Sequence, residues 1–170
     1  MEGRKEAGPD GGGEAAERLR EDLDYGCLND LVGHLLRHAF LRGQQVFADV
    51  FAGEALTPLQ FMVLELVDRN DGITHGDVAA AMSCAPSVLT TALKPLTASG
   101  TLEQVTVAGD RRRVAYRLSA TGRERFLKLR PMIGEAEDRL LDGLEADDRE
   151  ALARILRRVS RRNSQLRNNR

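Results

Sequence analysis

The sequence predicts a mainly α-helical fold with a small β-hairpin wing, that is, a winged helix-turn-helix flanked by further helices. Three observations predict it. Apolar residues repeat at helical spacing along most of the chain. A helix-turn-helix pattern ends at Ser99-Gly100. Two β-type runs then follow directly around the turn sequence Ala108-Gly109-Asp110.

The N-terminal part is expected to be a tail followed by one long helix. Residues 1 to about 20 are acidic and glycine-rich, which predicts disorder. A helix is expected from about Leu23 to Phe51, because apolar residues recur there every three or four positions. These residues are Leu28, Leu31, Val32, Leu35 and Ala39.

Clear start and stop signals bound the next three helices. Thr57-Pro58-Leu59-Gln60 combines a capping threonine, a first-turn proline and a capping-box glutamine, and Asn70-Asp71-Gly72 ends that helix. Thr74 opens a short helix through Met82. A third helix is expected from about Pro86 to Ala98, where glycine at position 100 acts as the C-terminal cap.

A hairpin and two helices complete the chain. The arms of the hairpin are expected at about 102–107 and 113–118; in the second arm apolar and arginine side chains alternate between two faces. A long helix is expected from about Thr121 to Leu144, with a kink at Pro131. A last helix should begin at Asp147 or Asp148 and fray after about Ser160.

Composition excludes several classes of protein. The net charge of −1 argues weakly against a nucleic-acid partner, but residues 74–126 are locally basic, and local patches decide phosphate attraction. Aromatic residues make up only 4%, which argues against stacking on single-stranded bases. Two distant cysteines suit a reducing compartment. No apolar run approaches about 20 residues, so a cytoplasmic protein without a membrane partner is expected.

The helix from Pro86 to Ala98 carries the first group of candidate DNA contacts. Its apolar stripe would face the core, and the opposite face is small and polar with one cation, which suits entry into a major groove. An ordinary solvated face fits the pattern equally well. Pro95 is expected to bend or loosen the last turn. The candidate contacts are Ser87, Thr90, Thr91 and Lys94.

The hairpin turn carries the second group. A narrow minor groove concentrates negative potential and favours inserted arginine, and an aspartate can hold a neighbouring guanidinium by a bidentate pair. A solvated charge run is the alternative, but the position directly behind a helix-turn-helix favours a DNA-binding wing. The candidate contacts are Asp110, Arg111, Arg112 and Arg113.

Three segments resemble the multiple-antibiotic-resistance regulator (MarR) family. Residues 56–64 resemble the second helix of its members, Asp110-Arg111-Arg112 matches an Asp-X-Arg wing motif, and residues 117–122 are similar to the family's exit from the wing. The resemblance covers roughly residues 25–160. The chain departs from the family at Thr91, where arginine is frequent, and at Pro95; these departures bear on the base contacts rather than on the fold.

The resemblance implies a homodimeric transcription regulator in which the first and last two helices form the dimer interface. Arg112 would be the minor-groove arginine and Asp110 its partner. The implied division of the chain is a disordered tail at 1–22, an N-terminal dimerisation helix at 23–54, a winged helix-turn-helix lobe at 55–120, C-terminal dimerisation helices at 121–162 and a basic tail at 163–170.

The resemblance also implies a small-molecule effector, often aromatic. Residues 30–39 resemble the first helix of members that sense aromatic acids or their coenzyme A thioesters. A surface or dimer-interface role is the alternative. The ligand residues would be His34, Arg37, His38, Leu41 and Phe61.

Two further kinds of site, a metal site and a reactive cysteine, are suggested by single features of the sequence. His34 and His38 lie four residues apart, as metal-binding pairs do, but no third ligand is evident nearby, so no metal site is expected. Cys27 lies where peroxide-sensing relatives place a reactive cysteine, and a helix N-terminus favours a thiolate. A lone cysteine is more often inert, and Cys84 is expected to pack.

The function expected is therefore repression of transcription by a dimer. It would bind a pseudo-palindromic double-stranded operator whose half-sites lie about 10 bp apart, and a small molecule would modulate that binding. The alternatives are a winged-helix interaction module without DNA binding and a cysteine-based redox-sensing regulator. No catalytic set, phosphate loop or complete metal motif is present, so neither enzyme activity nor a cofactor is expected.

Overall fold

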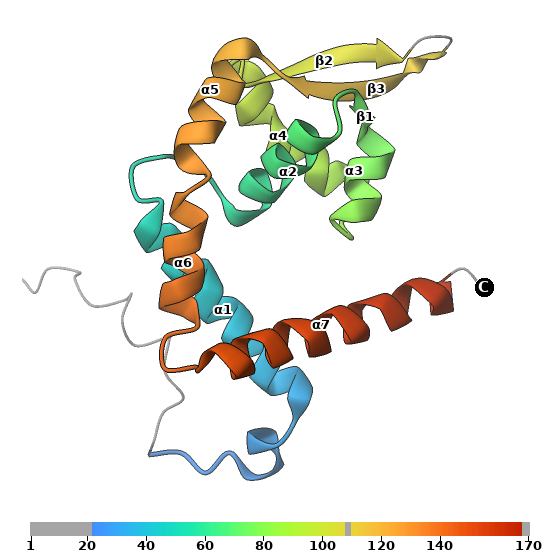
Figure 1. Cartoon of the computed structure of the whole chain (residues 1–170). Coiled ribbons are helices and arrows are strands. Elements are labelled where there is room, and N and C mark those ends of the chain that lie inside the picture. The colour runs from blue at the N-terminus through green and yellow to red at the C-terminus, as the bar shows by residue number, and fades with distance from the viewer. Residues whose placement is uncertain (1–21, 108–109, 168–170) are drawn as a thin grey trace, which may run out of the picture.

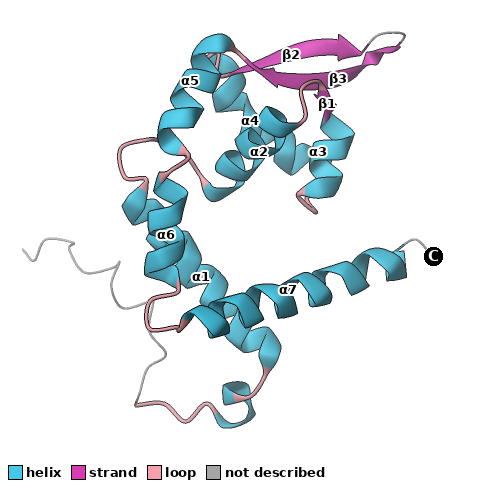
Figure 2. Cartoon of the chain, in the orientation of Figure 1, coloured by secondary structure: helices cyan, strands magenta, loops and turns pink. Residues whose placement is uncertain are grey.

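The computed structural model describes residues 22–107 and 110–167 and is mainly helical. A compact lobe contains the helix-turn-helix and all three strands, and a helical base lies beside it (Figures 1 and 2). The elements are a 3-10 helix at Gly26–Asn29, α1 (Val32–Val50), α2 (Pro58–Arg69), β1 (Ile73–Thr74), α3 (His75–Ala81), α4 (Pro86–Ala98), β2 (Leu102–Val107), β3 (Asp110–Leu118), α5 (Ala120–Leu129), α6 (Met132–Leu140) and α7 (Ala146–Arg167).

The predicted fold class and the winged helix-turn-helix are confirmed. The capping box at Thr57 forms as expected: Gln60 N–H donates to Thr57 Oγ1, and Thr57 N–H donates to Gln60 Oε1. The bounds of α4 are those predicted. The three strands form an antiparallel sheet in the order β1-β3-β2.

The first helix begins later than predicted. Two residues interrupt the predicted helix: Gly26 has a φ of +50°, with its N–H donating to Asp24 Oδ1 at 2.8 Å, and Leu31 is extended with a ψ of 105°. A positive φ breaks helical continuity. A short 3-10 turn occupies Gly26–Asn29, and α1 starts at Val32.

The predicted helix from Thr121 to Leu144 is two helices, α5 and α6. Pro131 separates them because it has no N–H to donate to the preceding turn. Its backbone stays in the α region, so the chain bends without reversing. The helix α6 ends at Leu140, before Gly143 at a φ of +82°.

Two other boundaries also differ from the prediction. The second hairpin arm begins at Asp110 and not at Arg113, so the aspartate belongs to β3 and pairs with Val107. The helix α7 begins at Ala146 and its backbone stays helical to Arg167, well beyond Ser160.

The core of the lobe is built from one apolar face of each helix and the inner face of the sheet. Leu64, Val78, Leu89 and Phe126 are at most 1% exposed. Gln60 is a buried polar residue whose Nε2 donates to the carbonyl of Ala92 at 2.8 Å, so α2 holds α4 by a direct bond. A buried, hydrogen-bonded amide of this kind stabilises the packing and also specifies the orientation of α4 relative to α2.

An aromatic cluster joins the lobe to the base. Phe47 and Phe51, at the end of α1, stack with centroids 4.1 Å apart, and Phe61 of α2 packs against both rings. Phe61 also contacts Phe126 of α5 at 5.6 Å. The base itself forms where α1 packs against α6, while α7 extends away from them (Figure 1).

The described helices include none that is both long enough and apolar enough to cross a membrane.

Candidate nucleic-acid interface

The helix α4 presents its predicted contact face to solvent. Three leucines of this helix are buried in the core, and Gln60 anchors it from behind. The four residues on the opposite face are all exposed: Ser87, Thr90, Thr91 and Lys94. Packing thus orients α4 with this face outward.

The hydroxyls of this face bond their own helix. Thr90 Oγ1 donates to the Pro86 carbonyl at 2.9 Å, and Thr91 Oγ1 donates to the Ser87 carbonyl at 3.1 Å. Thr90 Oγ1 also lies 3.5 Å from His75 Nε2, whereas the Thr91 oxygen can still accept a hydrogen bond from a base amino group. With the hydroxyl turned to the backbone, the threonine methyl group is available for a thymine methyl.

Pro95 does not end α4. The helix continues to Ala98, and hydroxyl groups bond carbonyls in its last turn. Thr97 Oγ1 donates to the carbonyls of Leu93 and Lys94, and Ser99 Oγ donates to that of Leu96. These bonds keep the C-terminal turn ordered where the proline has removed a backbone donor.

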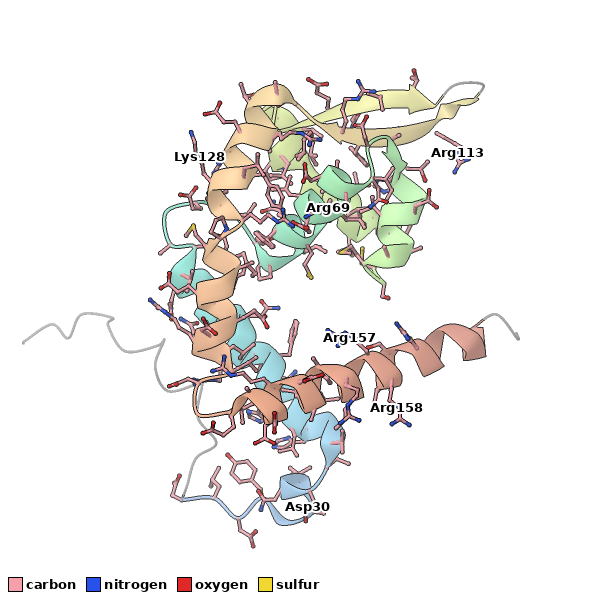
Figure 3. The ribbon with its side chains drawn as sticks, in the orientation of Figure 1. Asp30, Arg69, Arg113, Lys128, Arg157 and Arg158 are labelled. Atoms are coloured by element: carbon pink, nitrogen blue, oxygen red, sulfur yellow. The ribbon has the colours of Figure 1, made fainter. Side chains whose placement is uncertain are left out.

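The wing motif begins β3. Asp110, Arg111 and Arg112 are the first three residues of the strand, and their side chains lie outside the part of the chain that can be described. The predicted pairing of Asp110 with a guanidinium therefore stays a prediction. Arg113 is exposed on the same strand near the tip of the wing (Figure 3).

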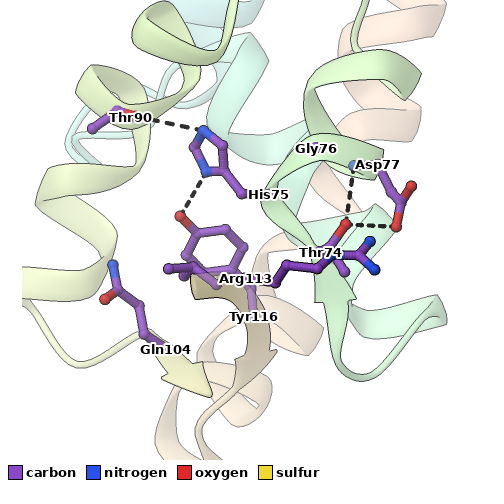
Figure 4. Close-up of a pocket in the computed structure, with 9 residues that line it drawn as sticks. Thr74, His75, Gly76, Asp77, Thr90, Gln104, Arg113 and Tyr116 are labelled. Carbon is purple, nitrogen blue, oxygen red and sulfur yellow. Dashed lines mark hydrogen bonds between the residues drawn. The ribbon is translucent and has the colours of Figure 1, made fainter. Parts of the chain in front are cut away.

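An open groove of about 530 Å³ separates α3, α4 and the wing. Arg113 extends from β3 toward the start of α3, beside Thr74 (Figure 4). Thr74 caps α3 by accepting from Asp77 N–H, and its hydroxyl donates to Asp77 Oδ2 at 2.6 Å. The lining residues are Thr74, His75, Gly76, Asp77, Thr90, Gln104, Arg113, Val114 and Tyr116.

His75 stands in this groove and contacts two elements besides its own. Its Nδ1 lies 2.8 Å from Tyr116 Oη on β3, and its Nε2 lies 3.1 Å from the Pro86 carbonyl at the start of α4. Burial raises the pKa of the Tyr116 phenol, which keeps its hydroxyl protonated. Neither His75 nor Tyr116 is among the site residues predicted from the sequence. The alternation along 113–118 placed Tyr116 on an inward face, but no spacing rule joins it to a histidine 41 positions away.

The proposed ligand residues do not form one cluster. His34, Arg37, His38 and Leu41 all belong to α1. Phe61 lies instead in the aromatic cluster with Phe47, which is 13 residues, or about 20 Å of helix, beyond His34.

Rings do gather around His34. Its ring contacts that of His38 edge-on at 4.5 Å and that of Tyr25 at 5.9 Å. Its buried Nε2 has no hydrogen-bond partner among the described residues. In the described part of the chain, no three histidine, cysteine or carboxylate side chains are grouped as a metal site requires.

The cysteines lie apart from α1 and from each other. Cys27 is exposed in the 3-10 turn, five residues before α1 begins, so it does not sit at the N-terminus of that helix. The N-terminus of α1, which is expected to favour a thiolate, is therefore not at Cys27. Cys84 is half-buried and packs against the core of the lobe, as expected.

Comparison with known proteins identifies the family. The MarR family model matches residues 56–113, which span the helix-turn-helix and most of the wing. The transcriptional repressor CouR, solved bound to a 23-mer DNA duplex, is 30% identical with a TM-score of 0.76, over 82% of this chain and 99% of CouR. The chain belongs to the MarR family.

Other MarR-like relatives are also regulators. BpsR of Bordetella bronchiseptica, whose DNA binding is regulated by 6-hydroxynicotinic acid, is 27% identical with a TM-score of 0.73, over 78% of this chain and 94% of BpsR. The HTH-type transcriptional repressor NicR of Pseudomonas putida is 24% identical over 132 residues, 78% of this chain and 84% of NicR. These relatives are transcription regulators and not enzymes, in agreement with the expectation from the sequence.

Proposed function

We propose that this MarR-family chain is a dimeric transcription repressor that binds a pseudo-palindromic operator. The observation that carries the proposal is that the exposed polar face of α4 and the arginine-bearing wing belong to one lobe. The relative CouR, at 30% identity, has been solved on a DNA duplex.

In this arrangement the two parts of the lobe have different roles. The first two turns of α4 enter the major groove, where Ser87, Thr90 and Thr91 meet base edges and Lys94 adds phosphate attraction. The wing enters the adjacent minor groove with Arg112, supported by Asp110, while Arg111 and Arg113 add positive potential.

Exposed apolar side chains on the helical base support dimerisation. They occupy α1 and α7, outside the lobe, and many large apolar side chains left exposed in a single chain are typical of an interface. A second copy of the chain would cover them, with segments 23–54 and 121–162 as the dimerisation regions. The residues are Leu31, Val32, Leu35, Leu36 and Phe40 on or next to α1, and Leu152, Ile155, Leu156 and Val159 on α7.

The effector is proposed to be an aromatic acid or its coenzyme A thioester. CouR has also been solved with p-coumaroyl-CoA, at 28% identity to this chain and a TM-score of 0.74. The buried, unpartnered Nε2 of His34 is a group that a bound carboxylate or carbonyl could satisfy. Arg37 and His38 lie within one turn of it on α1.

A band-shift titration of the purified protein against the DNA upstream of its own gene tests the proposal. Binding should saturate, resist competitor DNA and weaken by at least tenfold between low and physiological salt, because phosphate contacts release counterions. Aromatic acids and their thioesters are then added to the bound complex, and release of the DNA identifies the effector class. Specific binding to neither this DNA nor a duplex selected from a random library would contradict the proposal.

A further inference from the structure

His75 occupies the junction between the two DNA-contacting parts of the lobe. It is the first residue of α3, and β1 directly before it pairs with β3, so Ile73 lies opposite Tyr116. The His75 side chain reaches across the groove to α4 (Figure 4). We call His75, Tyr116 and Pro86 the helix–wing link. One hydrogen bond joins His75 Nδ1 to Tyr116 Oη, and another joins His75 Nε2 to the Pro86 carbonyl.

The chemistry of the two partners fixes the direction of both bonds. The Pro86 carbonyl can only accept, so Nε2 of His75 carries a hydrogen and donates to it. In the neutral imidazole Nδ1 is then an acceptor, and the Tyr116 hydroxyl donates to it. Both ring nitrogens are satisfied at once, and the ring is held between two elements.

Each end of the link lies beside a proposed DNA contact. Pro86 is the first residue of α4, next to Ser87 and one turn before Thr90, and recognition helices contact bases mainly through their N-terminal residues. Tyr116 lies three residues, or about 10 Å, along β3 from Arg113.

The buried leucines of α4 do not hold its first residues, whose position depends on other contacts. Leu89, Leu93 and Leu96 fix the buried face of the helix from its second turn onward. The turn before α4 contains Ser83 at a φ of +51°, and the N–H groups of Ser83 and Cys84 donate to carbonyls of α3. The His75 bond adds a direct polar tie between the start of α4 and the wing.

We propose that His75 is a positioning residue for DNA recognition: through the helix–wing link it sets the orientation of the N-terminal turns of α4 relative to the wing. The proposal rests on the proposed DNA-binding function. It assigns no contact between His75 and DNA. Its consequence is that breaking the link at either end should misalign the major-groove contacts with the minor-groove contacts while leaving phosphate attraction intact.

Three substitutions separate the two ends of the link. Tyr116→Phe removes only the hydroxyl that bonds Nδ1. His75→Gln places an amide near the former Nε2 and can keep the Pro86 bond, and His75→Asn places one near Nδ1 and can keep the Tyr116 bond. Thr97→Val is the matched control, because it also removes hydroxyl bonds from α4 but at the far end of the helix.

The affinity of the full-length protein is measured for a duplex selected from a random library and for an unselected duplex. Each link variant should bind the selected duplex roughly threefold to tenfold more weakly, the range expected for one net hydrogen bond. Affinity for the unselected duplex and the salt slope should not change. The double variant of His75→Asn with Tyr116→Phe should bind no more weakly than Tyr116→Phe alone, because His75→Asn breaks the Pro86 end and Tyr116→Phe the other, and one broken end already disconnects the link.

The outcomes distinguish this proposal from the DNA-binding function. Wild-type affinity in all three link variants would overturn the proposal while leaving the function intact. Equal losses on both duplexes would also overturn it, since they would point to a phosphate contact or to damage to the fold. A loss in Thr97→Val equal to that in the link variants would do the same. Absence of any selected duplex for the wild-type protein would overturn the DNA-binding function itself.

Discussion

At the scale of single residues, the wing carries four consecutive charged residues, Asp110 to Arg113. Three consecutive arginines, Arg111 to Arg113, begin β3 beside Asp110, on a hairpin that projects from the lobe (Figure 1). Arg113 is exposed on this strand, and the contacts of Arg111 and Arg112 stay predictions.

Arg112→Ala tests the minor-groove assignment. We expect specific DNA affinity to fall by about 10- to 100-fold, because one arginine and its groove electrostatics are lost. Lys128→Ala is the control: it removes one exposed positive charge from α5 (Figure 3), where Lys128 pairs with Glu124. Band shifts measure affinity, and sedimentation velocity should show an unchanged oligomeric state for both variants. An Arg112→Ala protein that binds as well as Lys128→Ala would mean that the wing does not enter the groove.

The candidate DNA contacts could be predicted from sequence because they follow from local signals. Proline at position 86 and Ser99-Gly100 bound α4, and the helical period then places its polar face outward. The helix–wing link could not be predicted this way. It depends on the pairing of β1 with β3, which are distant in the sequence, and on how α4 packs against α3, which no helix period specifies.

At the scale of elements, the junction between the wing and α5 depends on one glycine. Ser119 caps α5 by accepting from Gly122 N–H at 2.9 Å, and Ser119 Oγ donates to the Gly100 carbonyl at 2.7 Å. The chain therefore passes close to the start of the hairpin. A Cβ on Gly122 would lie 2.1 Å from the backbone carbonyl oxygen of Thr101. This contact gives a physical reason for the glycine in the segment that resembles the family's exit from the wing.

Gly122→Ala should destabilise the protein by about 2–3 kcal/mol or more, because backbone must move to admit the methyl group. Gly134→Ala is the matched control. Gly134 lies within α6 with open space around its position, so alanine there should stabilise by about 0.5–1 kcal/mol. Urea unfolding at a fixed protein concentration measures both. Equal stabilities for the two variants would contradict the close packing of α5 on the hairpin.

The helix boundaries show which features of an element are local. Pro131 could be recognised as a point of bending, and the structure places the break between α5 and α6 there. The late start of α1 could not be recognised, because Leu28 and Leu31 continue the apolar period into a segment where Gly26 adopts a positive φ. Apolar periodicity indicates which side chains can share one face, and here the pattern begins before the helical backbone of α1 does.

At the scale of the whole molecule, the proposed DNA contacts and the proposed dimer interface lie in different parts of the chain. Ion pairs hold α5 against the lobe: Arg123 lies 3.0 Å from the nearly buried Asp68, and Arg130 lies 2.9 Å from Glu65. Beyond Pro131 the chain enters the base, where α6 packs on α1. A change in how two bases meet would thus be transmitted through α5 to the spacing of two lobes, which is how an effector bound at the base could alter operator affinity.

The exposed stripe on α7 tests this division. Ile155 is 50% exposed within the single chain, so Ile155→Glu should leave the fold of each chain intact. In a two-fold symmetric interface the substitution places two unpaired carboxylates against apolar surface. We expect the dimer dissociation constant to rise by about 100-fold or more, measured by sedimentation velocity.

Leu127→Glu supplies the comparison for that experiment. Leu127 is 52% exposed on α5, inside the segment 121–162 but not among the apolar side chains of α1 and α7 that are proposed to form the interface, and the same substitution there should leave the dimer intact. DNA affinity also distinguishes the two variants. A monomer binds one half-site, whereas a dimer binds two, and its affinity is higher because the second half-site is bound at a high effective concentration. Ile155→Glu should therefore lose affinity for a two-half-site duplex but retain that for a single half-site. If it remained dimeric, or if Leu127→Glu dissociated instead, self-association would have to occur through another face of the chain.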